Sequence, residues 1–183
     1  MAIHILFDRP VSTMKVYDEF GRDRMSFPAS GDAWGAKYGH DGPIPPGHYM
    51  LTEVNDLRTS DAPLGIVSEG PMQIHVEDMP ASVAAELVRA HKAHAIGSEF
   101  SVGGAQAKIG QLAAWGRSEV MIHSGGSNAP DPFAARQQLC KTYGCTRAHT
   151  VDVLALGRFL APALAAGQHV IFTVIGDSPA LSC

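Results

Sequence analysis

The chain has 183 residues, of which 45% are hydrophobic and 17% are charged, and its formal net charge at pH 7 is −4. A chain of this length is most often one domain with a substantial core, so a single domain over residues 1–183 is predicted. The negative charge gives no electrostatic reason to expect a nucleic acid or an anionic membrane surface as a partner, and no stretch approaches the roughly 20 apolar residues of a membrane span.

The first half of the chain is predicted to be rich in β-strands. β-Branched and aromatic residues dominate the first two segments, and residues 12–17 largely alternate between polar and apolar side chains. A turn at 19–22 and a Gly- and Pro-rich loop at 31–47 separate later segments. The predicted strands are residues 2–7, 11–18, 24–29, 49–54 and 72–77.

A helical insertion is predicted for residues 80–116. Pro80 suits a first helical turn, and apolar residues such as Val83 and Leu87 then recur at helical spacing. After the insertion, residues 151–160 are typical of a buried helix that ends near Pro162 or Gly167, and a last strand is expected at 168–175. The predicted fold class is therefore mainly β, with an α+β arrangement.

The stretch from 120 to 149 carries the candidate chemistry. A short apolar strand ends at His123, a loop and a helical segment follow, and a tight turn contains Gly144 and Cys145. A thiol nucleophile needs a base that takes its proton and backbone donors for the developing oxyanion. Cys145 is predicted to be the nucleophile and His123 its base.

This stretch resembles the L,D-transpeptidases of the YkuD type, which act on bacterial peptidoglycan. Their pattern is a histidine, a spacer, and then Ser or Thr, any residue, Gly, Cys, a small or apolar residue, and Arg or Asn. Here His123 is followed by residues 124–141 and then by the run Thr142, Tyr143, Gly144, Cys145, Thr146 and Arg147. Many members have His where this chain has Tyr143. The step from Pro46 and Gly47 to Tyr49, with Ser30-Gly31 upstream, is similar to a second family signature.

The resemblance implies a β-sandwich with a cleft, and acyl transfer by the thiol on tetrapeptide stems, as an L,D-transpeptidase or an L,D-carboxypeptidase. It assigns the oxyanion hole to backbone amides at Tyr143 and Gly144, together with that of Cys145. The Ser124 carbonyl is expected to orient the His123 ring. Substrate binding is assigned to Arg147, whose guanidinium suits a carboxylate, and to Thr142.

Two other interpretations remain open. A non-catalytic peptidoglycan-binding or structural module would keep the same fold. A zinc site built from Cys140, Cys145, His149 and His123 has loose spacing and lacks a Cys-x2-Cys pair, so no metal and no cofactor are predicted. The order of His before Cys differs from that of papain-like peptidases.

The start of the chain, Met1 to Phe7, has no basic region, long apolar region or cleavage site. Since the substrate lies outside the cytoplasmic membrane, the expected location is the periplasm or the exterior. The compact Gly42–Tyr49 motif resembles type VI secretion effectors, which implies secretion machinery and an immunity protein as partners. The three cysteines cannot all pair, although Cys140 and Cys145 could form a reversible disulfide.

Overall fold

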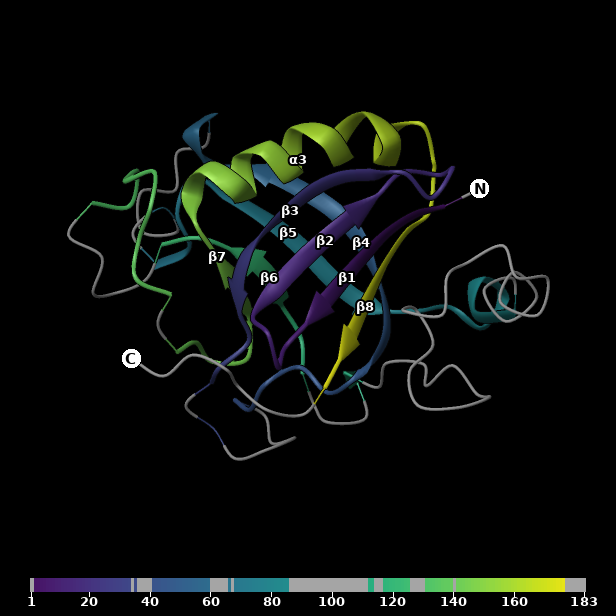
Figure 1. The fold of residues 1–183 in the computed structure, drawn as a ribbon, viewed down its shortest axis with the longest axis horizontal. Helices are drawn as coiled ribbons and strands as arrows, with labels where there is room; N and C mark the ends of the chain where they lie inside the picture. Colours follow the sequence, from purple (N-terminus) through teal and green to yellow (C-terminus); the bar gives the residue numbers. More distant parts are fainter. Residues whose placement is uncertain are drawn as a thin grey trace.

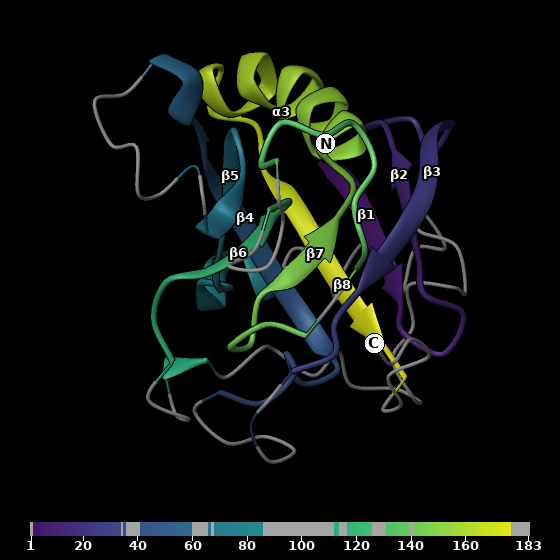
Figure 2. The same ribbon diagram turned by 90° about the vertical axis from the view of Figure 1, so that its left-hand side faces the viewer.

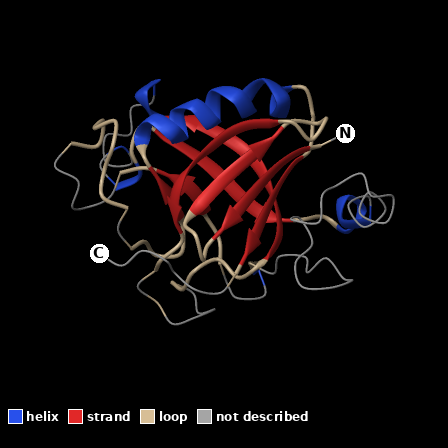
Figure 3. Cartoon of the chain, in the orientation of Figure 1, coloured by secondary structure: helices blue, strands red, loops and turns tan. Residues whose placement is uncertain are grey.

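The structure is a computed structural model that describes residues 2–33, 35, 41–59, 66, 68–85, 112–113, 117–125, 131–139 and 141–176. Most of the described chain is strand and loop (Figure 3). The strands are β1 (Ile3–Asp8), β2 (Thr13–Tyr17), β3 (Asp23–Ser30), β4 (Gly47–Asp56), β5 (Met72–Asp78), β6 (Val120–His123), β7 (Thr146–Ala148) and β8 (Val170–Ile175). The helices with assigned bounds are η1 (Leu57–Thr59) and α3 (Thr150–Ala165).

The strands form one sheet that closes on itself in the order β1-β2-β3-β7-β6-β5-β4-β8. Strands β1, β2 and β3 pair antiparallel as the expected meander, and β8 runs parallel to β1 and antiparallel to β4. Figure 1 shows the strongly twisted strands passing beneath α3. The prediction of a mainly β, α+β fold is confirmed, and the strands expected in a sandwich belong to one continuous closed sheet.

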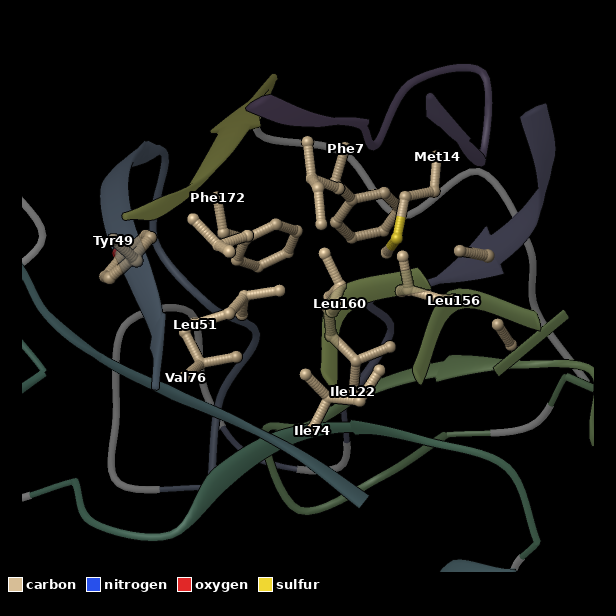
Figure 4. Close-up of a cluster of buried hydrophobic side chains, with 14 of the residues drawn as sticks. Phe7, Met14, Tyr49, Leu51, Ile74, Val76, Ile122, Leu156, Leu160 and Phe172 are labelled. Carbon is tan, nitrogen blue, oxygen red and sulfur yellow. The ribbon is translucent and has the colours of Figure 1, made fainter. Parts of the chain in front are cut away.

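The core fills the inside of this sheet. Strand side chains that point inward alternate with polar ones, and α3 contributes Val153, Leu156 and Leu160 to the same cluster. Figure 4 shows Leu160 between Phe7 and Ile122, and Leu156 beside Met14. A Cβ at Gly157 would lie 1.9 Å from the Met72 sulfur, so the glycine allows α3 to approach β5 closely.

The strands predicted at residues 2–7, 11–18, 24–29, 49–54, 72–77 and 168–175 agree with the observed bounds to within two residues at each end. Residues 81–85 are helical, and the Ala84 amide donates to the Pro80 carbonyl at 3.0 Å, as expected for the start of the insertion. Residues 86–111, the bulk of the predicted insertion, lie outside the described residues. No helix in the described part of the chain is long and apolar enough to cross a membrane.

The helical segment predicted between His123 and Cys145 is wrong for residues 131–139, which form turns and bends. Asp131 accepts the Phe133 amide on its side chain at 2.8 Å and the Ala134 amide on its carbonyl at 3.1 Å. The Gln137 side chain accepts the Gly125 amide at 2.8 Å. The bonds to Asp131 stabilise turns, and the bond from Gly125 to Gln137 holds the segment against the end of β6. The amides that donate to Asp131 are not available for the hydrogen bonds of a helix.

Candidate active site

Strands β6 and β7 bring the two ends of the sequence motif together. They pair in parallel, with Ile122 opposite Thr146 and His123 opposite Arg147, and they lie side by side in Figure 2. Ile122 points into the core, so His123 faces the other side of the sheet, and its register partner Arg147 faces the same way. Cys145 directly precedes β7, which places it beside the last residues of β6.

A row of polar side chains crosses five strands at the level of His123. The register pairs place Asn55 opposite Gln73, Gln73 opposite His123, His123 opposite Arg147, and Arg147 opposite Ser30. The neighbours of these residues in β3, β5 and β6 belong to the core, so the row faces away from it. The sheet therefore presents amide, imidazole, guanidinium and hydroxyl groups in one line that passes beside the candidate nucleophile.

The His123 ring is buried, with only 3% of the residue exposed, and its Nδ1 lies 2.5 Å from the Ser124 carbonyl oxygen. Burial lowers the pKa of His123 to about 4; backbone hydrogen bonds with Ser124 and Glu69 oppose this shift, and the Arg147 charge adds to it. The ring is therefore neutral at pH 7. Because a carbonyl only accepts, the short Ser124 contact assigns the ring proton to Nδ1.

The buried neutral His123 predicts a pH-dependent stability. An unfolded histidine takes up a proton below its ordinary pKa of 6.5, whereas the folded ring stays neutral down to about pH 4. The free energy of unfolding should therefore fall as the pH drops from 6.5 to 4, by up to about 3 kcal/mol, and this contribution should be constant above pH 6.5. Urea unfolding from pH 4 to 7.5 measures it. In His123→Gln this part of the slope should vanish, and equal slopes in both proteins would contradict the assignment.

The Cys145 side chain is partly buried, and its Sγ lies 3.9 Å from the Glu119 carbonyl oxygen. Burial raises the pKa of the Cys145 thiol, and the Glu69 carboxylate adds to the rise. The groups that act in the opposite direction on this pKa are the Met121 amide and the guanidinium groups of Arg117 and Arg147.

The resting site therefore holds a neutral thiol at Cys145 and a neutral imidazole at His123. The thiol contacts the backbone of Glu119 and Met121, and the His123 ring contacts the backbone of Ser124 and Glu69. Proton transfer between Cys145 and His123 would accompany attack on a substrate, since no ion pair is formed beforehand.

The turn before Cys145 is held from two sides. Thr142 donates its hydroxyl to the Cys145 carbonyl at 2.7 Å and its amide to the Asp32 carbonyl at 3.1 Å. Gly144 has a φ of +102°, a conformation that side chains rarely adopt. Within the described ranges, the amides of residues 143–145 donate to no protein group. Three adjacent donors at the nucleophile are thus available to an incoming oxyanion.

The predicted site residues have different surroundings. Arg147 and Ser124 are buried next to His123, whereas the side chain of Tyr143 is 75% exposed. Thr142 is 4% exposed and its hydroxyl bonds within the turn, so its described contacts are structural. Its role in substrate binding, like that of Arg147, stays a prediction.

Two residues beside the thiol were not predicted from the sequence. Arg117 donates to the Gly144 carbonyl, and Glu69 lies close enough to influence the pKa of Cys145. Glu69 also accepts a hydrogen bond from Gln73. Both residues lie outside the sequence motif, in segments without clear periodicity, so the sequence around them did not indicate a place in the site.

The cysteine and histidine set considered for zinc is only partly described. Cys140 lies outside the described residues. The predicted disulfide between Cys140 and Cys145 therefore stays a prediction. His149 precedes α3, and its Nδ1 accepts the Gln137 amide at 3.2 Å. Within the described ranges, no cluster of three or more His, Cys, Asp or Glu residues is arranged to hold a metal ion.

Comparison with known proteins connects this geometry to a fold. No protein family and no curated protein matches the chain by sequence. Among solved structures, the helical cell shape determining protein Pgp2 from Campylobacter jejuni matches with a TM-score of 0.52 and 14% identity, over 97% of this chain and 48% of Pgp2. The chain has an L,D-transpeptidase-like fold.

Two further structures are similar at lower scores. Bd1075 from Bdellovibrio bacteriovorus has a TM-score of 0.49 and 17% identity, over 93% of this chain and 46% of Bd1075. L,D-transpeptidase 1 from Mycobacterium tuberculosis has a TM-score of 0.38 and 16% identity, over 96% of this chain and 62% of that protein. The chain spans just under half the length of Pgp2 and Bd1075.

Proposed function

We propose that the chain is a cysteine acyltransferase that acts on tetrapeptide stems of peptidoglycan, as an L,D-transpeptidase, an L,D-carboxypeptidase or both. The observation that carries the proposal is the parallel pairing of β6 and β7, which aligns His123 with the strand that follows Cys145. With the ring proton on Nδ1, facing the Ser124 carbonyl, Nε2 is the nitrogen proposed to accept the thiol proton. The fold supports the same proposal, because Pgp2 is described as a determinant of cell shape.

In the first half-reaction, Cys145 Sγ attacks the carbonyl carbon at the L-centre of the diamino acid and gives its proton to His123 Nε2. The carbonyl oxygen becomes an oxyanion that accepts hydrogen bonds from the amides of residues 143–145. The carbon–nitrogen bond then breaks as the imidazolium returns its proton to the leaving D-alanine amine. A thioester on Cys145 remains.

In the second half-reaction, an amine or water attacks the thioester and His123 accepts its proton. The bond from carbon to sulfur breaks and the thiol is restored. An amine on a second stem gives a crosslink, a free D-amino acid gives exchange, and water gives carboxypeptidase activity. Arg147, in the polar row beside His123, is the group proposed to bind a stem carboxylate.

Mass spectrometry of muropeptides tests this function. Purified wild-type protein incubated with tetrapeptide muropeptides is expected to release D-alanine and to give tripeptides, crosslinked dimers or exchanged stems. Cys145→Ala should give none of these products. Binding to peptidoglycan without any Cys145-dependent product would instead support the non-catalytic module.

The proposal includes action outside the cytoplasmic membrane, as a housekeeping enzyme or as an antibacterial effector. Export of the chain into the periplasm of a Gram-negative host by a fused signal peptide separates these two. An effector should cause swelling or lysis that disappears in Cys145→Ala. A harmless exported protein that adds crosslinks would contradict the effector role.

A further inference from the structure

Arg117 is a buried cation beneath the turn that carries the candidate nucleophile. Only 6% of the residue is exposed. Its Nη2 donates to the Gly144 carbonyl at 2.8 Å, and its Nη1 donates to the Pro43 carbonyl at 2.9 Å. Burying a charge is costly, so a guanidinium retained here indicates a position set by these two carbonyls.

The bond to Gly144 has a direct consequence for the next amide. In a trans peptide the carbonyl and the N–H point in opposite directions. The Gly144 carbonyl faces Arg117 inside the protein, so the N–H of Cys145 in the same peptide plane points away from Arg117. The following peptide is held by the bond from Thr142 to the Cys145 carbonyl. Both peptides that flank the Cys145 α-carbon therefore have fixed carbonyls.

We propose that Arg117 is a positioning residue that orients the Gly144–Cys145 peptide so that the Cys145 amide can stabilise an acyl oxyanion. The inference rests on the proposed function, because the oxyanion arises only in acyl transfer. It assigns a role to a residue outside the sequence motif. Arg117 lies 27 residues from Gly144 and 74 from Pro43 along the chain.

The local backbone is built for this contact. A Cβ at Gly144 would lie 2.1 Å from Arg117 Nη2, so only glycine leaves room for the guanidinium. The Arg117 amide donates to the Leu112 carbonyl at 2.9 Å, which fixes its backbone. Between Arg117 and β6, Glu119 adopts a φ of +58°, and its carbonyl meets the thiol. The segment 117–119 thus contacts both the turn and the sulfur.

Arg117 also acts on the thiol by its charge. It lowers the pKa of Cys145, whereas burial raises that pKa. Burial in turn lowers the pKa of Arg117 itself below its ordinary value. A lysine at this position would keep a positive charge, but its single ammonium lacks the planar fork that spans two carbonyls. Arg117→Lys therefore removes the orientation of the Gly144–Cys145 peptide and keeps the charge, whereas Arg117→Met removes both.

The test compares two reactions of Cys145 in the 183-residue chain that carries Cys140→Ser and Cys183→Ser, so that Cys145 is the remaining thiol of the three. Acylation by p-nitrophenyl acetate passes through an oxyanion, with nitrophenolate as the leaving group, whereas alkylation by iodoacetamide does not. In Arg117→Lys, acylation should fall by about 100-fold while alkylation stays within about 3-fold of the parent protein. In Arg117→Met both should fall at neutral pH, with the alkylation profile moved to higher pH.

Arg9→Met is the matched control. Arg9 is also a buried arginine, and its described hydrogen bonds go to the carbonyls of Ile44, next to Pro43, and Gly176, both outside the Cys145 turn. Its loss should lower the melting temperature and leave both rates within about 2-fold. If Arg117→Met fails to fold, Arg117→Lys and rescue of Arg117→Ala acylation by added guanidinium decide the question.

Equal loss of acylation and alkylation in folded Arg117→Lys, or no loss of acylation, would overturn the inference. Failure of the proposed function has a different signature, since the ester reaction needs no peptidoglycan. In that case the parent protein makes no muropeptide product, while the acylation and alkylation rates still separate in Arg117→Lys.

Discussion

Cys145→Ala is expected to reduce turnover of tetrapeptide muropeptides by about 10⁴-fold or more, and His123→Ala by a comparable factor. The reason is that nucleophile and base act in one step, so removing either leaves the other without a function. The double variant should be no worse than the more damaging single variant. Rates of D-alanine release by each purified protein measure the three effects.

The fold should survive the first of these changes. Cys145 is only partly buried, and the hydrogen bond of its thiol is a long 3.9 Å contact to Glu119. The melting temperature of Cys145→Ala should therefore lie close to that of the wild type, and Cys183→Ala should match the wild type in rate. Near-wild-type turnover by Cys145→Ala would remove the thiol from the mechanism.

Gly144→Ala is the second substitution with a large expected effect. Gly144 has a φ of +102°, and the added Cβ would lie 2.1 Å from Arg117 Nη2 and 2.9 Å from the Gly42 carbonyl oxygen. Backbone strain of this kind costs about 1–3 kcal/mol, and the displaced guanidinium would release the peptide before Cys145. We expect a loss of stability in that range and a fall in kcat of about 100-fold or more.

Gly167→Ala provides the control for backbone strain alone. Gly167 also has a positive φ, of +72°, but a Cβ there would meet nothing within 4 Å. It should lose about 1 kcal/mol of stability and keep full activity. Urea unfolding and muropeptide turnover of both variants give the comparison. If Gly144→Ala lost no more activity than Gly167→Ala, the arrangement of the turn would not matter for catalysis.

The parts of the fold that repeat a local pattern could be predicted from the sequence. Alternation of polar and apolar residues located β2 and β5, and the apolar run after Thr150 located α3. β7 escaped prediction because three residues are too few to show a period. The helix continues past Pro162 to Ala165, since a proline near the end of a helix removes only a late hydrogen bond.

The site divides in a similar way. Cys145 and His123 could be predicted because they belong to a sequence motif with a recognisable spacing. The polar row through Asn55, Gln73 and Ser30 could not, because it depends on strand register. A slip of one residue would turn every side chain of a strand to the opposite face, and composition does not fix that choice. Arg117 reaches partners far along the chain, so only the folded structure brings it to the turn.

Intact-mass spectrometry of the protein during turnover tests the central claim most directly. After rapid mixing with a tetrapeptide stem, a fraction of the chain should gain the mass of the stem without its terminal D-alanine. Peptide mapping should place this adduct on Cys145, hydroxylamine should remove it, and Cys145→Ala should never acquire it. A wild-type chain that stays unmodified while product accumulates, or an adduct that persists in Cys145→Ala, would contradict acyl transfer through this thiol.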